Sequence, residues 1–352
     1  MQLKLWVLSL LDQHKTVQYS SQISYQILRS LNEIESIATE WDSLLDQSPC
    51  NRAFSCSKWY LVSARTDDSF SPYVLVGHRG SQIAGILPTA ITNDGETLTF
   101  AGELSDYNDI IARETDHEVL AGLMSRALFF GRDYRRVVLN RVRSDSNCAR
   151  AVRLLSPTLD LAKSFSIKTN SRYIRLPSSY RDYLSTRSRN FRKNLKRARR
   201  DAENNNVSVR ELDVDNFSPS RLAEVFLSLN LERWGSNCYY NLDRPRTFVL
   251  NILPDLFAER RLRAFALTSD QNLLAMDLCM VGANSLCSWN GGFLSEASRW
   301  SPGTLLIDAG IKHSYSAKFD EYDLLRGEEP YKQRWVNSTR EIGSFEFNAN
   351  CS

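Results

Sequence analysis

Two short runs near the carboxyl end of the 352-residue chain combine residue types that could bind an anion and supply a proton. Ser301, Pro302 and Gly303 are typical of a helix start, because serine is a favoured N-cap and proline is tolerated at the first helical position. The unpaired N–H groups and positive dipole end of such a helix attract phosphate. Tyr331 and Lys332 place a phenol and an ammonium where a second helix is expected to begin. These runs predict an anion site beside a proton donor.

Further polar residues flank these runs. Asp323 lies in a short predicted strand and Glu328 follows it, so either carboxylate could accept a proton from a substrate. Arg326 and Lys332 could pair with these acids or hold an anionic substrate. Asn290 precedes two glycines, which indicates a backbone position that a ligand or another strand approaches closely.

A strongly basic segment precedes these runs in the chain. Residues 187–200 contain eight basic side chains and no acidic one. At about 100° per residue, an apolar stripe lies opposite a cationic arc, which predicts a docked amphipathic helix over residues 184–204. The stripe consists of Leu184, Phe191, Leu195, Ala198 and Ala202. The cationic face, with Arg192 and Arg197, could be solvated, contact a phosphate-bearing ligand or acidic glycan, or bind nucleic acid.

Hydrophobic periodicity predicts the same order of elements in both halves of the chain. The first half has predicted helices at 28–45 and 53–64, strands at 73–77, 82–87 and 97–101, a helix at 119–130 and a strand at 136–139. The second has helices at 218–233 and 246–260, strands at 262–267, 273–281 and 286–289, a helix from 302 and a strand at 322–325. This repeat predicts a duplicated α/β (α+β) unit, and two unrelated α+β domains are the alternative. We expect a leader at 1–24 and domains at 25–160 and 161–347, with the boundary near 156–170.

Composition restricts the class of protein. The net charge is only +3, so any site for a polyanion must be local. Seven cysteines without a CxxC pair indicate reduced thiols and a cytoplasmic location. Four scattered histidines favour neither a metal site nor a Ser-His-Asp triad. The apolar first eleven residues are too short to cross a bilayer, which takes about 20 residues, so no transmembrane segment is predicted.

Five motifs in order resemble the CelD-type, FemAB-like branch of the GNAT acyl-CoA acyltransferase superfamily. They are WDSLL (41–45), DYND (106–109), NFRKNLKRARRD (190–201), LERW (231–234) and the series NGGF, SPGTLL and FDEYDLLRGEEPYKQRW between 290 and 335. The resemblance implies two GNAT-like halves, each with a mixed, largely antiparallel central sheet flanked by helices. It also implies transfer of an acyl group from acyl-CoA to an amine or hydroxyl, with no metal, in polysaccharide or cell-envelope synthesis.

The resemblance assigns roles to particular positions. The phosphates of acyl-CoA would meet the start of the helix at Ser301, Pro302, Gly303, Thr304 and Leu305. Tyr331 would protonate the leaving thiolate, with Asp323 or Glu328 as the base. A small-molecule or glycan-precursor acceptor would lie in a cleft between the halves, near Asp106, Tyr107, Asp109 and Trp234.

One departure from the family pattern bears on the donor. Residues 299–304 read RWSPGT, with one glycine in place of a glycine-rich phosphate loop. Aminoacyl-tRNA, the donor of FemAB relatives, therefore stays open as an alternative to acyl-CoA. A non-catalytic module that binds an anionic glycan is the alternative from another class of protein.

Overall fold

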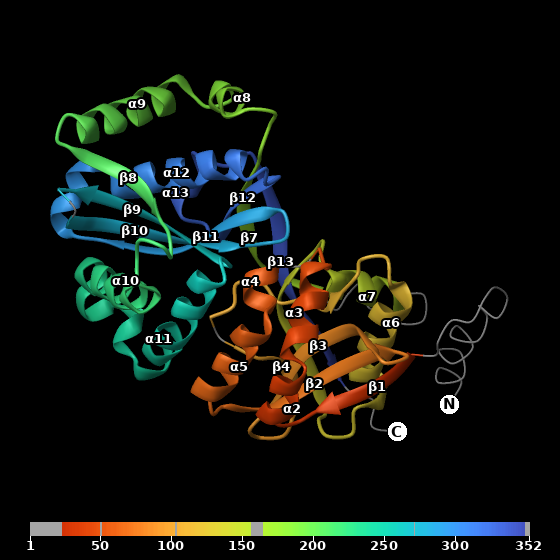
Figure 1. Cartoon of the computed structure of the whole chain (residues 1–352). Helices are drawn as coiled ribbons and strands as arrows, with labels where there is room; N and C mark the ends of the chain where they lie inside the picture. Colours follow the sequence, from red (N-terminus) through yellow and green to blue (C-terminus); the bar gives the residue numbers. More distant parts are fainter. Residues whose placement is uncertain (1–22, 50, 103, 156–164, 271, 349–352) are drawn as a thin grey trace.

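The structure is a computed structural model that describes residues 23–49, 51–102, 104–155, 165–270 and 272–348. Its strands form one 13-stranded sheet with helices on both faces (Figure 1). The strand order is β1-β2-β3-β4-β6-β13-β7-β12-β11-β10-β9-β8, and β5 pairs with β3. All described pairs are antiparallel except β4–β6 and β11–β12. The expected mixed fold, a largely antiparallel sheet flanked by helices, is confirmed.

The first half runs from β1 to α7. Its elements are β1 (Ile23–Leu28), α2 (Leu31–Ser36), α3 (Ala38–Asp46), α4 (Arg52–Ser55), α5 (Ser57–Thr66), β2 (Phe70–Arg79), β3 (Gln82–Thr92), β4 (Thr97–Phe100), β5 (Ile111–Ala112), α6 (His117–Ser125), a π-helical turn (Arg126–Phe130), β6 (Arg136–Arg143) and α7 (Asn147–Leu155).

The second half begins with β7. Its elements are β7 (Phe165–Arg175), α8 (Tyr180–Ser185), α9 (Arg189–Glu203), β8 (Val207–Leu212), α10 (Pro219–Trp234), α11 (Asp243–Ala258), β9 (Leu262–Ser269), β10 (Asn272–Val281), β11 (Ser285–Phe293), α12 (Pro302–Ser316), β12 (Glu321–Arg326), α13 (Pro330–Gln333) and β13 (Ser338–Asn348).

The two halves repeat one topology, and β13 of the second half pairs with the first. Each half has an antiparallel meander that ends in a parallel pair, β4–β6 in the first and β11–β12 in the second. The last strand of the chain, β13, pairs with β6 of the first half, and β7 pairs with β12 of the second. Because β7 and β13 also pair with each other, the two halves form one continuous sheet.

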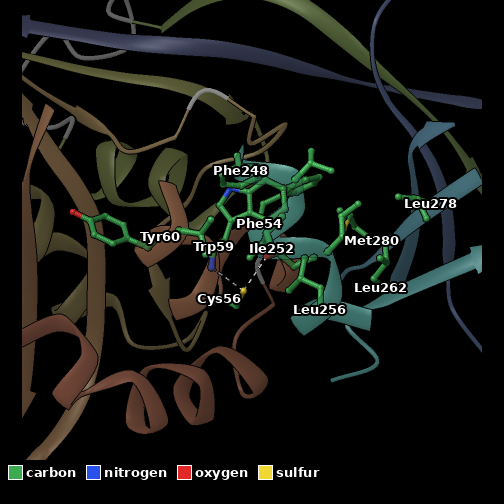
Figure 2. Packing of buried hydrophobic residues seen from close by; sticks show 14 of the residues in the cluster. Phe54, Cys56, Trp59, Tyr60, Phe248, Ile252, Leu256, Leu262, Leu278 and Met280 are labelled. Atoms are coloured by element: carbon green, nitrogen blue, oxygen red, sulfur yellow. Dashed lines mark hydrogen bonds between the residues drawn. The ribbon is translucent and has the colours of Figure 1, made fainter. Parts of the chain in front are cut away.

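One apolar cluster spans both halves. Helices α3, α5, α10 and α11 contribute to it. Figure 2 shows the part where residues of α5 and α11 meet residues of β9 and β10. At its centre the ring of Trp59 lies edge-on to that of Phe248, with 5.0 Å between centroids. The face of the sheet opposite this cluster is covered by α6 and α7 in the first half and by α9 and α12 in the second. A strand such as β10 is therefore apolar on both faces, which explains its nearly continuous hydrophobic run.

Several predicted boundaries were wrong. The helix expected at 28–45 is divided at Ile37, and its first residue belongs to β1. The helix expected at 53–64 is divided at Cys56, whose sulfur accepts a hydrogen bond from Trp59 N–H and so caps α5. The basic helix begins at Arg189, with Ser188 as its N-cap, so Leu184 belongs to the separate α8.

Other predictions fall partly outside the described residues. Of the expected leader, residues 1–22 are outside, while residues 23 and 24 begin β1. Residues 156–164 of the expected boundary are also outside, and residues 165–170 lie in β7. The division into two domains stays a prediction. The five described cysteines are free and buried.

Polar contacts fasten the first half to the end of β12. The hydroxyl of buried Tyr107 donates to Asp323 Oδ2 at 2.9 Å, across 216 residues of sequence. Beside it, Arg326 Nε donates to Asp106 Oδ1 at 2.5 Å. Burial raises the pKa of Asp323 against the positive charges of Arg340 and Arg143, so its hydrogen bond from Tyr107 compensates part of the cost of burying the carboxyl.

We predict that Tyr107→Phe lowers the free energy of unfolding by about 1–3 kcal/mol, because it removes a hydrogen-bond donor from a buried carboxyl. Urea denaturation followed by tryptophan fluorescence measures the change. Tyr315→Phe is the matched control, since the buried Tyr315 hydroxyl has no hydrogen-bond partner in the described structure. Equal stabilities for the two variants would contradict the structural role of the Tyr107 contact.

Candidate active site

A cavity of about 1190 Å³ opens where β11 and β12 separate. The two strands pair only over residues 285–287 and 321–323. Beyond that point residues 288–293 and 324–326 line the cavity from either side. Its other walls include the start of α9, the end of α10, the start of α12 and the segment around α13. Met276 and Asp277 of β10 and Asp106 of the first half also line it. The sheet thus opens between its two parallel strands, and helix ends surround the opening.

Local backbone features explain the separation. Leu325 has a φ of 60°, a left-handed conformation that bends β12, and its N–H donates to Asp323 Oδ1 at 2.8 Å. On β11, the register shifts at Trp289. Gly292 packs so tightly against α10 that an added Cβ would lie 2.5 Å from the carbonyl carbon of Leu229. The close approach expected at the glycine pair is therefore made by α10.

The start of α12 opens into this cavity. Ser301 occupies the N-cap position with φ 55° and ψ 58°, and its side chain makes no capping hydrogen bond, contrary to the role expected for a serine there. Its carbonyl accepts from Thr304 N–H at 2.9 Å. Pro302 has no N–H, and the N–H of exposed Gly303 has no partner among the described residues. The 15-residue helix therefore presents a free amide and its positive dipole end to the cavity.

Two details differ from expectation at this helix. A 3-10 helix at Ser295–Trp300 separates β11 from α12, which therefore does not follow the strand directly. Leu305 is buried in the core and does not line the cavity, whereas residues 301–304 do.

Tyr331 lines the cavity. It sits in α13 and remains 46% exposed, and its hydroxyl has no hydrogen-bond partner in the described part of the chain. Burial raises the pKa of Tyr331 to about 12, and the negative charges of Glu329 and Asp277 act in the same direction. The phenol is therefore protonated at neutral pH and able to donate.

Asp277 is a cavity residue that sequence reasoning missed. It lies on β10, is 9% exposed, and accepts hydrogen bonds from Ser288 Oγ at 3.0 Å and Cys279 Sγ at 3.3 Å. Burial raises the pKa of Asp277 to about 6, against these hydrogen bonds and the positive charge of Arg233. The available signal was a single carboxylate within the apolar run of residues 273–281, because buried charges are rare without a purpose.

Arg233, inside the LERW motif, is a second cavity residue that was missed. Its Nη1 donates to Gly291 O at 3.1 Å, and its guanidinium lies over the rings of Trp234 and Phe293. No carboxylate among the described residues forms an ion pair with it, and burial lowers its pKa. Arg233 therefore adds unneutralised positive charge to the cavity.

Five predicted substrate residues line the cavity, and four of them form hydrogen bonds or ion pairs with other residues of the protein. Lys332 Nζ donates to Arg326 O at 2.5 Å and pairs with Glu329 at 2.9 Å. Arg326 pairs with Asp106, as described above. Asn290 Nδ2 donates to the Tyr240 hydroxyl at 2.8 Å. Trp234, 50% exposed, keeps its ring available at the cavity wall.

Four other predicted site residues lie elsewhere. Asp323 and Tyr107 are hydrogen-bonded to each other, and neither lines the cavity. Exposed Glu328 does not line it either. The carboxylate of Asp109 accepts from Asn147 N–H at 3.0 Å and from Cys148 N–H at 2.6 Å, so it stabilises the start of α7.

The basic helix α9 is docked as its pattern predicted. The Phe191 ring meets Trp335 edge-on at 4.8 Å, and Arg199 pairs with Asp308 of α12 at 2.6 Å. Its first turns contribute to the cavity wall. Arg192 and Arg197 are exposed on the outer face, outside the cavity lining.

Two negative findings concern the described residues. They contain no group of three or more His, Cys, Asp or Glu side chains arranged to hold a metal ion. In this part of the chain, none of the helices combines the length and apolar character needed to traverse a bilayer.

Comparisons with solved structures identify the fold. FemX superposes with a TM-score of 0.60 at 12% identity, over 93% of this chain and 98% of that one. L-PGS from Bacillus licheniformis gives 0.54 at 9% identity, over 92% and 93% of the two chains. The C-terminal domain of a putative lysylphosphatidylglycerol synthetase from Agrobacterium fabrum gives 0.53 at 13%, over 90% and 92%. These structures share the whole two-halved fold.

No curated protein sequence matches the chain. A sequence-family match covers residues 189–333, which include α9, Asp277, α12 and Tyr331, and its family is described as "Acetyltransferase (GNAT) domain". The cavity is thus built largely within the matched segment. By this match, residues 189–333 are similar to GNAT acetyltransferase domains.

Proposed function

We propose that the protein transfers an acyl group from acyl-CoA to an acceptor in this cavity. One observation carries the proposal: a single cavity contains both the free amide end of α12 and a protonated phenol, Tyr331. The α12 end suits the phosphates of a carrier, because a helix N-terminus binds anions through backbone N–H groups and the helix dipole. Arg233 adds positive charge to the same cavity.

The chemistry follows from these positions. The acceptor attacks the acyl carbonyl carbon, the carbon–sulfur bond breaks, and its electron pair leaves on sulfur. Tyr331 donates its proton to that thiolate. Arg233 can stabilise negative charge on the carbonyl oxygen, because its guanidinium is not neutralised by a carboxylate of the described protein. The CelD-type order of motifs implies an acceptor used in polysaccharide or cell-envelope synthesis.

Gly303 offers a direct test of the carrier site. We predict that Gly303→Asp abolishes the thermal stabilisation by acetyl-CoA, because a carboxylate at the helix start repels phosphate. The variant should be folded and as stable as the parent, since an added Cβ would meet no atom within 4 Å and an acid favours a helix N-terminus. Differential scanning fluorimetry over an acetyl-CoA titration measures both quantities.

Gly303→Ala is the matched control for this experiment. It adds the Cβ without the charge and should bind acetyl-CoA within about threefold of the parent. If both variants, or neither, lost acetyl-CoA binding, the electrostatic role of the α12 start would be rejected.

We predict that Tyr331→Phe lowers kcat about 100-fold or more with little change in the melting temperature, because the half-exposed ring remains and only the proton donor is lost. Release of free thiol from acyl-CoA measures turnover. Tyr315→Phe, in the last turn of α12 and outside the cavity lining, should be as active as the parent. Parental turnover in Tyr331→Phe would exclude an acid role for this phenol.

A second donor, aminoacyl-tRNA, is favoured by the outer face of α9. Six basic side chains of α9 are exposed. Among the described residues, only Arg200 of these six has an acidic partner, Asp201 at 3.7 Å. The six are Arg189, Arg192, Lys193, Lys196, Arg197 and Arg200. None of these six side chains lines the cavity, but the first turns of the same helix do, so a long polyanionic carrier could extend from the cavity over this face. The fold is also shared with FemX.

If tRNA is the carrier, Arg192→Ala with Arg197→Ala should weaken its retention at least tenfold and flatten the dependence of log Kd on log salt concentration. Filter binding at several salt concentrations measures this, and Arg221→Ala with Arg246→Ala on other helices is the control pair. Unchanged retention and slope would remove α9 from the donor site. Glycan binding without consumption of any acyl donor would instead favour a non-catalytic module.

A further inference from the structure

We infer that the transferred acyl group is a hydrocarbon chain longer than acetyl, and that it lies on an apolar lip of the cavity. The apolar lip consists of Trp234 and Phe293, which line the cavity, and Leu231, which precedes Trp234 on α10. This inference rests on the proposed function and names the class of acyl donor for the same cavity. It assigns Trp234 to the donor, whereas the order of motifs had implied a contact with the acceptor.

Large apolar side chains are exposed beside this cavity. Of the nine that are exposed in the described part of the chain, Leu231, Trp234 and Tyr331 come from the two helices α10 and α13, both of which contribute to the cavity wall. Leu231 is 46% exposed and Trp234 is 50% exposed. Because residues three apart on a helix are neighbours on its surface, these two side chains form one apolar surface. Such a surface at the mouth of a cavity indicates that part of a ligand covers it.

Arg233 connects the apolar lip to the reacting group. Its guanidinium carbon lies 4.6 Å from the centroid of the Trp234 ring and 5.0 Å from that of the Phe293 ring. Its Nη1 also donates to Gly291 O at 3.1 Å, which fixes the side chain against β11. If this guanidinium stabilises the carbonyl oxygen of the thioester, as proposed, the carbon chain on that carbonyl begins beside the apolar lip. An acetyl group ends at its one methyl, whereas a longer chain would cover the two rings.

The cavity has room for such a chain. Its volume of about 1190 Å³ exceeds the roughly 300–1,000 Å³ that is typical of small-molecule pockets. The ring of Trp289, another lining residue, stacks on Phe226 with 6.2 Å between centroids, so part of the wall belongs to the rigid apolar cluster that spans both halves. Neither the volume nor the polarity of the lining therefore restricts the donor to acetyl.

The expected gain in affinity follows from the area removed from water. Complete burial of one methylene group strengthens binding about fourfold at 25 °C. Because the apolar lip is open to solvent on one side, we expect about half of this free energy, or about a twofold gain for each methylene. Hexanoyl-CoA has four methylenes more than acetyl-CoA and should bind about 16-fold more tightly. The CoA part is the same in both ligands, so the affinity ratio isolates the chain.

The test titrates the full chain with acetyl-, butyryl- and hexanoyl-CoA by isothermal titration calorimetry. In the parent we expect the hexanoyl-to-acetyl affinity ratio of about 16, and in Trp234→Gln a ratio of about three or less, because the apolar surface is lost. Trp234→Leu keeps an apolar side chain without an aromatic face and should retain most of the ratio. Leu250→Gln is the matched control and should keep the parental ratio, since Leu250 is 38% exposed on α11 and does not line the cavity.

Several results would overturn the inference. A parental ratio near one would do so without any variant, as would an unchanged ratio in Trp234→Gln. Loss of the ratio in both Trp234 variants would mean that the ring serves only to hold Arg233. The amine n-hexylamine is the probe for the other substrate: if it binds through Trp234 while the ratio for the thioesters is near one, the apolar lip serves the acceptor.

A thioester without phosphates separates this inference from the proposed function. S-hexanoyl-N-acetylcysteamine carries the same chain but cannot use the α12 start. If it binds through Trp234 while acetyl-CoA does not bind, the acyl-CoA proposal fails and the chain site remains. If acetyl-CoA binds but neither hexanoyl thioester gains affinity over its acetyl counterpart, only the inference fails.

Discussion

The candidate site depends on the separation of two parallel strands that begin as hydrogen-bonded neighbours. Once β11 and β12 part, their backbone N–H and C=O groups need other partners, because unpaired buried groups are costly. The protein supplies several from side chains: Asp323 accepts from Leu325 N–H, Arg233 donates to Gly291 O, and Lys332 donates to Arg326 O. The residues that surround the cavity therefore also hold it open. A substitution of one of these residues is therefore expected to alter both the shape of the cavity and its chemistry.

The first half has the same topology but closes the equivalent gap with its own chain. After β4, the backbone of Asn108 donates to Arg141 O at 3.0 Å, and the Arg141 side chain donates to Ser105 O at 2.7 Å. Arg141 has a positive φ, like Leu325 of β12. The segment that fills this gap continues to Asp106 and Tyr107, which fasten β12. The second half therefore contains the open cavity, and residues of the first half stabilise β12 at its edge.

The sequence predicted those helices and strands whose pattern of polar and apolar residues can be recognised within the element itself. The α9 stripe and the apolar strands of the second half were recognised, because a helix face or a doubly buried strand is visible in ten residues. β7, β8 and β13 were missed, since they are rich in polar residues and are stabilised by pairing with strands distant in the sequence. Carboxylates posed the same difficulty. Asp323 and Asp277 both stand in apolar strands, and only packing against Tyr107 distinguishes the structural acid from the one that lines the cavity.

The central claim is that the free amide end of α12 binds the phosphates of an acyl carrier beside Tyr331. Amide hydrogen exchange of the parent protein, with and without saturating CoA, tests it most directly. We expect slower exchange at the start of α12 and in the separated parts of β11 and β12, with little change in the closed gap of the first half. No protection at residues 303–306, or protection confined to the first half, would contradict the account.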